Sequence, residues 1–214
     1  MQWMWYVAYG TNLSWERFRM YLQGGRPWVG GRDHPGCRDP FGPQREMALM
    51  VPGGIRFVGD STIWGGGTAV YDARAAAEVA VRAYLITAEQ FVDVLAQEMR
   101  LEPRLDLDLG PVQRTGWHSL GPGRYQTLAQ LGTQDDVPML TFTSAEVADQ
   151  PINAPTRGYL RTMATGLREA HGWSAERIGR YLARFPGAAG IWTPTSIENL
   201  ALEPRHYLTS TGHG

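Results

Sequence analysis

The chain has 214 residues, 43% of them hydrophobic, and a formal net charge of −1. This length suits one domain with a full hydrophobic core. The near-neutral charge excludes the large basic field that binding to nucleic acid or acidic lipid requires, so we expect neither a nucleic-acid nor a membrane partner. All 20 cationic residues are Arg, which indicates the codon bias of a GC-rich bacterial genome rather than a functional demand.

The first half of the chain predicts short strands around one helix. Residues 3–9 form an apolar, aromatic and β-branched run that predicts a buried strand. Ser14 is the expected N-cap of a helix that ends at Gly24, and residues 30–46, rich in Gly and Pro, predict a loop. Four further strands are expected, at residues 47–51, 55–58, 68–71 and 79–86.

The second half predicts three helices. Thr87 and Gln90 have the spacing of a capping box that opens a helix through Met99. Residues 101–136 carry little periodic signal; within them we expect one solvated strand face at Asp106 and Asp108 and a hairpin at residues 121–123. The remaining elements are a strand at 139–143 and helices at 155–171 and 174–185.

The order of these elements predicts a mixed α+β fold. We expect a single domain over residues 1–214, with a helical C-terminal part at about 155–185 and an irregular tail. Residues 1–6 lack a positive region followed by an apolar run, and no stretch of 18 apolar residues occurs, so neither a secretory leader nor a membrane span is expected. The single Cys37 excludes an internal disulfide and favours a reducing, cytoplasmic compartment.

Glu98 occupies an unusual position on the helix predicted for residues 87–99. At about 100° per residue, it follows Val94 and Leu95 on the apolar face, whereas Asp93 and Gln97 fall on a polar arc. An inward carboxylate is costly unless it is paired or functional, and burial raises its pKa toward the range of a proton shuttle. Periodicity alone leaves two interpretations open: a functional carboxylate, or a structural ion pair with an Arg.

A second candidate site is the loop between the first strand and the first helix, with the sequence Tyr9-Gly10-Thr11-Asn12-Leu13. Glycine permits close backbone approach, and the first N–H groups of a helix lack internal partners. Such a terminus suits a carboxylate or a developing oxyanion. An ordinary strand–helix turn has the same local pattern.

These two sites together resemble the γ-glutamylcyclotransferase family. The loop is similar to the family's Tyr-Gly-Ser-Asn-Leu motif, with Thr11 in place of Ser. Residues 64–69 resemble its Trp-x-Gly-Gly segment, and residues 83–98 resemble the strand and helix that deliver the catalytic Glu. Farther on, residues 154–167 resemble the closing helical segment, so the resemblance extends over about residues 3–185.

The resemblance implies a small β-barrel flanked by helices and a cofactor-free enzyme that releases 5-oxoproline from a small γ-glutamyl amine or amino acid. In this acyltransferase- or lyase-type reaction the substrate's α-amine attacks its own γ-carbonyl. The resemblance assigns proton transfer to Glu98. It assigns substrate binding to the loop and one later tyrosine, that is, to Tyr9, Gly10, Thr11, Asn12, Leu13 and Tyr159.

Several alternatives remain at this stage. Within the cyclotransferase class, a deprotection step in a biosynthetic pathway, as in some relatives, is one open role. The competing functions are a non-catalytic binding module on the same fold and an amide hydrolase for another acyl group. His34 and Cys37 have the spacing of metal ligands, but two ligands do not make a zinc site, so no metal is expected. The leaving amine and the oligomeric state stay open.

Overall fold

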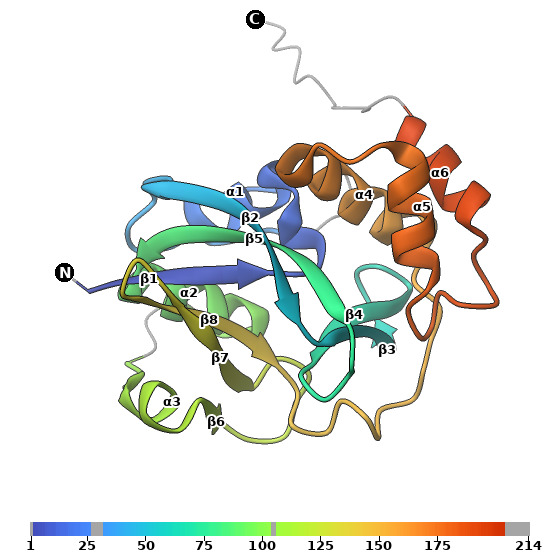
Figure 1. The fold of residues 1–214 in the computed structure, drawn as a ribbon. Helices are drawn as coiled ribbons and strands as arrows, with labels where there is room; N and C mark the ends of the chain where they lie inside the picture. The colour runs from blue at the N-terminus through green and yellow to red at the C-terminus, as the bar shows by residue number, and fades with distance from the viewer. Residues whose placement is uncertain (1, 27–31, 104–105, 204–214) are drawn as a thin grey trace, which may run out of the picture.

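The computed structural model describes residues 2–26, 32–103 and 106–203, and its main feature is an open six-stranded sheet. The strands lie in the order β2-β5-β1-β8-β7-β6 (Figure 1). Their bounds are β1 Trp3–Ala8, β2 Arg45–Pro52, β5 Glu78–Thr87, β6 Trp117–Ser119, β7 Thr127–Gln134 and β8 Val137–Thr143. β1 is central, antiparallel to β5 and parallel to β8, and buried on both faces, which explains its continuous apolar run.

A second, two-stranded sheet pairs β3 (Gly54–Ser61) with β4 (Gly66–Asp72). The mixed α+β class is confirmed, but the expected barrel is not: the large sheet is not closed, and β4 does not join the sheet of β1, β5 and β8. A side-chain bond links the two sheets instead, since Thr143 Oγ1 donates to the carbonyl of Tyr71 over 2.5 Å. β3 and β4 satisfy each other's backbone groups and therefore need no place in the larger ladder.

Helices cover both faces of the large sheet (Figure 1). On one face Trp5 and Val7 pack with α4 (Arg157–His171), α5 (Ala175–Ala183) and α6 (Pro194–Leu202). On the other face Met4 and Tyr6 pack with α1 (Trp15–Gln23) and α2 (Ala88–Glu98). Alternate side chains of β1 thus pack into two separate hydrophobic cores, one on each face of the sheet. None of the helices in the described part of the chain combines the length and the apolar character of a membrane-crossing segment.

Helix α2 begins as its sequence predicts, but its polar arc is not solvent-facing. Thr87 Oγ1 accepts from the Gln90 amide, and the Gln90 side chain accepts from the Thr87 amide, which completes the capping box. Asp93 and Gln97 are nevertheless completely buried, because the loop that precedes β2 covers them. Arg38 in that loop donates to Asp93 from both its backbone and its side chain. The middle of the helix is therefore covered on its polar side as well, whereas Glu89 in its first turn stays exposed.

The segment between α2 and β8 contains more regular structure than its weak periodicity predicts. The expected hairpin exists as β6 and β7, with helix α3 (Gly110–Thr115) before it. The expected strand at Asp106 and Asp108 is wrong: both residues are exposed and lie in irregular chain before α3. The tail after residue 185, expected to be irregular, contains α6, whose N-cap Thr193 accepts from the Ser196 amide.

Candidate functional site

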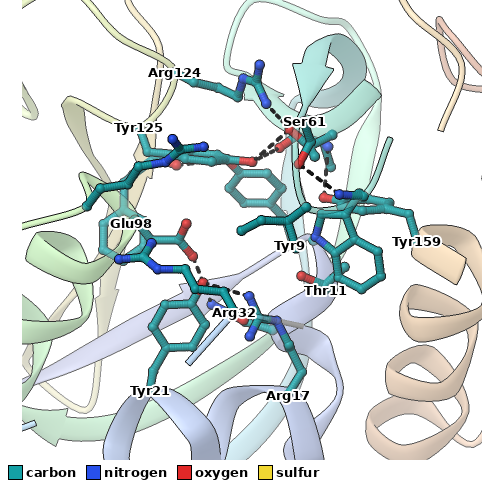
Figure 2. Close-up of a pocket in the computed structure, with 18 of the residues that line it drawn as sticks. Tyr9, Thr11, Arg17, Tyr21, Arg32, Ser61, Glu98, Arg124, Tyr125 and Tyr159 are labelled. Atoms are coloured by element: carbon teal, nitrogen blue, oxygen red, sulfur yellow. Dashed lines mark hydrogen bonds between the residues drawn. The ribbon is translucent and has the colours of Figure 1, made fainter. Parts of the chain in front are cut away.

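A pocket of about 260 Å³ opens where β1, α1, the β3–β4 hairpin and the end of α2 meet. It contains aromatic, basic and acidic side chains from segments far apart in sequence (Figure 2). Its lining residues are Tyr6, Tyr9, Gly10, Thr11, Asn12, Arg17, Tyr21, Arg32, His34, Asp60, Ser61, Ile63, Trp64, Thr68, Ala69, Glu98, Arg100, Arg124, Tyr125, Phe142 and Tyr159.

The loop after β1 forms one wall of this pocket. Residues Thr11–Leu13 make a single 3₁₀ turn that precedes α1. The Leu13 amide bonds the carbonyl of Gly10, so the amides of Thr11 and Asn12, first in the turn, have no acceptor within it. Tyr84 holds the turn from below by donating from its hydroxyl to the carbonyl of Asn12 over 2.9 Å.

Glu98 is the last residue of α2, and its side chain lines the pocket. The Asn12 side-chain amide lies 3.5 Å from Glu98 Oε1 and also donates to the Tyr6 hydroxyl over 2.9 Å. Burial raises the pKa of Glu98 above its ordinary value, and this effect is opposed by hydrogen bonds from Tyr21 and Asn12 and by the positive charge of Arg17. Within the described residues no cation lies at salt-bridge distance from Glu98, although the charges of Arg17 and Arg32 act on its carboxylate.

A chain of side chains from α1 and the following loop orients the Glu98 carboxylate. His34 Nε2 lies 2.5 Å from Arg17 Nη1, and Arg17 Nη2 donates to the Tyr21 hydroxyl over 3.1 Å. Burial and the Arg17 charge lower the pKa of His34 to about 3, so the imidazole is neutral and accepts from Arg17. Because Arg17 can only donate, the Tyr21 proton is directed toward Glu98, to which this phenol is hydrogen-bonded.

Two further tyrosines line the pocket: Tyr125 lies beside Glu98, and Tyr159 lies across the pocket from it (Figure 2). The Tyr159 hydroxyl accepts from the Ala69 amide over 2.9 Å, and the Tyr125 hydroxyl donates to the Ala69 carbonyl over 3.0 Å. Burial and the charge of Glu98 raise the pKa of Tyr125 to about 12. Both phenols therefore stay protonated at neutral pH, and the Tyr125 proton is already donated to the Ala69 carbonyl.

The structure brings together most of the residues expected at the site. Tyr9, Gly10, Thr11, Asn12, Glu98 and Tyr159 all line the pocket. Leu13 does not: its side chain is completely buried in the core beneath the turn, and its carbonyl accepts from Arg82 over 3.0 Å, so its expected place against substrate is wrong.

Sequence reasoning missed the basic and phenolic residues of the pocket, namely Arg17, Arg32, Arg100, Arg124, Tyr21 and Tyr125. The only signal for them was the number of Arg and Tyr residues, and a count does not show which of them lie at the site. His34 and Cys37 do not face a common centre: His34 bonds Arg17, whereas Cys37 donates to the carbonyl of Tyr21. Among the residues that the structure describes, no three His, Cys, Asp or Glu side chains are grouped so that they can hold a metal ion.

Comparison with known proteins places this arrangement in context. No protein-family model matches the chain. Histone deacetylase 5 from Arabidopsis thaliana is 30% identical over 198 residues, which cover 84% of this chain and 30% of that protein. The chain therefore spans about 30% of the length of this curated relative.

Two solved structures share the architecture. An uncharacterized protein from Homo sapiens superposes with a TM-score of 0.53 at 15% identity, covering 95% of this chain and 100% of that one. A γ-glutamyl cyclotransferase superposes with a TM-score of 0.54 at 15% identity, covering 94% of this chain and 98% of that one. At this identity the comparison establishes the fold: the chain has the γ-glutamyl cyclotransferase-like fold.

Proposed function

We propose that the protein is a γ-glutamyl cyclotransferase, which releases 5-oxoproline from a small γ-glutamyl compound, with Glu98 as its proton-transferring residue. The observation that carries the proposal is the convergence of the turn after β1 and the end of α2 on one pocket, with Asn12 Nδ2 lying 3.5 Å from Glu98 Oε1. Glu98 thereby lies within the length of one glutamyl group from the amides of Thr11 and Asn12. The fold shared with a γ-glutamyl cyclotransferase supports the same activity.

The pocket offers a group for each part of a γ-glutamyl substrate. The Thr11 and Asn12 amides suit the oxygen of the reacting carbonyl, on which negative charge develops. Asn12 Oδ1 is a buried acceptor without a partner among the described residues, and it suits the substrate's α-ammonium. The phenols of Tyr125 and Tyr159 also line the pocket and limit the conformations open to a bound chain.

The reaction then needs a single acid–base residue. Glu98 takes a proton from the α-ammonium, and the freed amine attacks the γ-carbonyl to form the lactam C–N bond. As the bond to the leaving amine breaks, Glu98 gives this proton to the leaving nitrogen. The ring nitrogen still carries a second proton, which passes through Glu98 to the departing amine, so a neutral lactam and an ammonium ion form without an added reactant. The raised pKa of Glu98 brings the carboxyl closer to the pH at which it both accepts and donates efficiently. Holding the substrate folded supplies the remaining acceleration, because the attack is intramolecular.

The product distinguishes this proposal from its two competitors. Incubation with γ-glutamyl amines and γ-glutamyl amino acids in ¹⁸O-labelled water is expected to give 5-oxoproline without ¹⁸O, because no water enters the bond that forms. An amide hydrolase gives glutamate that carries one ¹⁸O. A binding module gives no product but saturable binding, and either of these two results would overturn the proposal.

A further inference from the structure

Two arginines reach the pocket rim at the β3–β4 hairpin from different parts of the chain. Arg124 comes from the connection between β6 and β7, and its Nη1 donates to Thr68 Oγ1 over 2.8 Å. Arg100 follows α2, two residues after Glu98, and its Nη2 donates to Thr62 Oγ1 over 3.2 Å. Both side chains line the pocket.

The backbone at Arg100 and at Gly59 has features that accommodate these two side chains. Arg100 has a φ of 62°, in the left-handed region that non-glycine residues rarely adopt, and this conformation turns the chain sharply after Glu98. A Cβ at Gly59 would lie 2.2 Å from Arg124 Nη2, so the Arg124 guanidinium packs directly against the hairpin backbone at that residue. A side chain at residue 59 would displace this guanidinium from its present position against the hairpin.

Neither Arg100 nor Arg124 forms a salt bridge with another described residue; each donates a hydrogen bond to a threonine hydroxyl instead. A guanidinium has five N–H donors, so each retains donors for a ligand. Asp60 also lines the pocket, but its carboxylate is not paired with either arginine. Cations held at a pocket rim by neutral hydroxyls are suited to an anionic ligand, because their charge is not already neutralised.

The net charge of the whole pocket also favours an anionic ligand. Four arginines and two carboxylates, Glu98 and Asp60, line it, which leaves a net charge of +2. His34 adds nothing, since its pKa is lowered to about 3. A glutamyl group carries one ammonium and one carboxylate and so has no net charge. The excess therefore matches a ligand with two negative charges outside the glutamyl group.

We propose that the substrate's leaving amine carries two anionic groups, as an acidic α-amino acid does, and that these groups bind Arg100 and Arg124. This inference rests on the proposed cyclotransferase function. It assigns the two ends of the pocket different tasks: the turn after β1 and Glu98 hold the reacting glutamyl group, and the rim at the β3–β4 hairpin selects the amine that leaves.

Three substrates whose leaving amines carry two, one and no carboxylates test this assignment: γ-glutamyl-aspartate, γ-glutamyl-alanine and γ-glutamyl-ethylamide. The expected order of kcat/KM for 5-oxoproline release is aspartate first, alanine second and ethylamide last. Hydrogen bonds to charged groups contribute enough that Arg124→Gln is expected to lower kcat/KM for γ-glutamyl-aspartate by roughly 10- to 100-fold and for the ethylamide by less than about twofold. Arg100→Gln is expected to act in the same direction without disturbing the buried side of the hairpin. Arg180→Gln, at an exposed arginine of α5, is the matched control.

Binding measurements keep this inference separate from the cyclotransferase activity. In a Glu98→Gln background, dissociation constants for the three compounds measured by calorimetry are expected to follow the same order, and Arg124→Gln is expected to remove the preference. Equal affinities for the charged and neutral compounds, or an equal effect of Arg124→Gln on all three, would overturn the proposed leaving group. Absence of 5-oxoproline from every compound, with the charge preference in binding intact, would overturn the activity instead.

Discussion

Replacement of Glu98 by Gln separates a proton-transferring carboxylate from a structural one. Glutamine keeps the length of the side chain, and its oxygen still accepts from Tyr21 and Asn12, but the amide does not exchange a proton near neutral pH. A general acid–base residue contributes at least ~100-fold to turnover, so kcat is expected to fall by that factor or more, which corresponds to about 2.7 kcal/mol of activation free energy. Substrate affinity is expected to change little, because the shape of the pocket is retained.

The same variant makes a prediction about stability. Burial raises the pKa of Glu98, so the folded protein holds this proton more tightly than the unfolded chain does. Its contribution to the free energy of unfolding therefore decreases as pH rises from the ordinary carboxyl range through the raised pKa. Glutamine removes that loss, and the melting temperature at pH 7 is expected to stay the same or rise.

Turnover on a γ-glutamyl substrate and thermal melting of one purified variant test both expectations. Glu89→Gln is the matched control, because Glu89 lies on the same helix, is exposed and pairs only at the surface with Arg38. It is expected to change turnover by less than about twofold and stability by less than about 1 kcal/mol. Full activity of Glu98→Gln together with a clearly lower melting temperature would refute the reasoning and return Glu98 to a structural role.

Three further variants test the surroundings of the carboxylate. Tyr21→Phe removes a hydrogen bond that lowers the pKa of Glu98, so the acidic limb of the kcat/KM–pH profile is expected to move to higher pH; an unmoved limb would mean that this phenol does not tune the reacting group. Gly10→Ala places a Cβ 3.2 Å from the Tyr159 hydroxyl, and the required displacement is expected to lower kcat/KM roughly tenfold with little change in melting temperature, whereas wild-type activity would count against a close fit at this wall. Asp93→Asn weakens the bonds that hold the loop before β2, and denaturant titration is expected to show a loss of about 2 kcal/mol, with no loss if the loop is held by packing alone.

Local sequence signals predicted the elements that carry the central part of the site. The capping-box spacing at Thr87 predicted the start of α2, and on a helical wheel Glu98 falls on the apolar face rather than on the polar arc. The glycine after β1 predicted a break before α1, and the structure has a 3₁₀ turn there. These signals are short-range, so a single sequence contains them in full.

Long-range contacts explain what the sequence did not predict. Asp93 and Gln97 look solvent-facing by periodicity, yet they are buried because a loop more than fifty residues earlier in the chain returns over α2. Arg124 and Tyr125 belong to a connection without periodic signal, and only the tertiary fold brings them into the pocket with Glu98. Pairing of β4 with β3 rather than with the large sheet depends on register across strands, which alternation within one strand does not specify.

A crystal structure of Glu98→Gln with a bound γ-glutamyl compound tests the central claim most directly. The account predicts the γ-carbonyl oxygen within hydrogen-bond distance of the Thr11 and Asn12 amides and the α-amine beside residue 98, with the leaving group directed toward the β3–β4 hairpin. Ligand density elsewhere, with the turn after β1 unoccupied, or a γ-carbonyl far from residue 98, would contradict it.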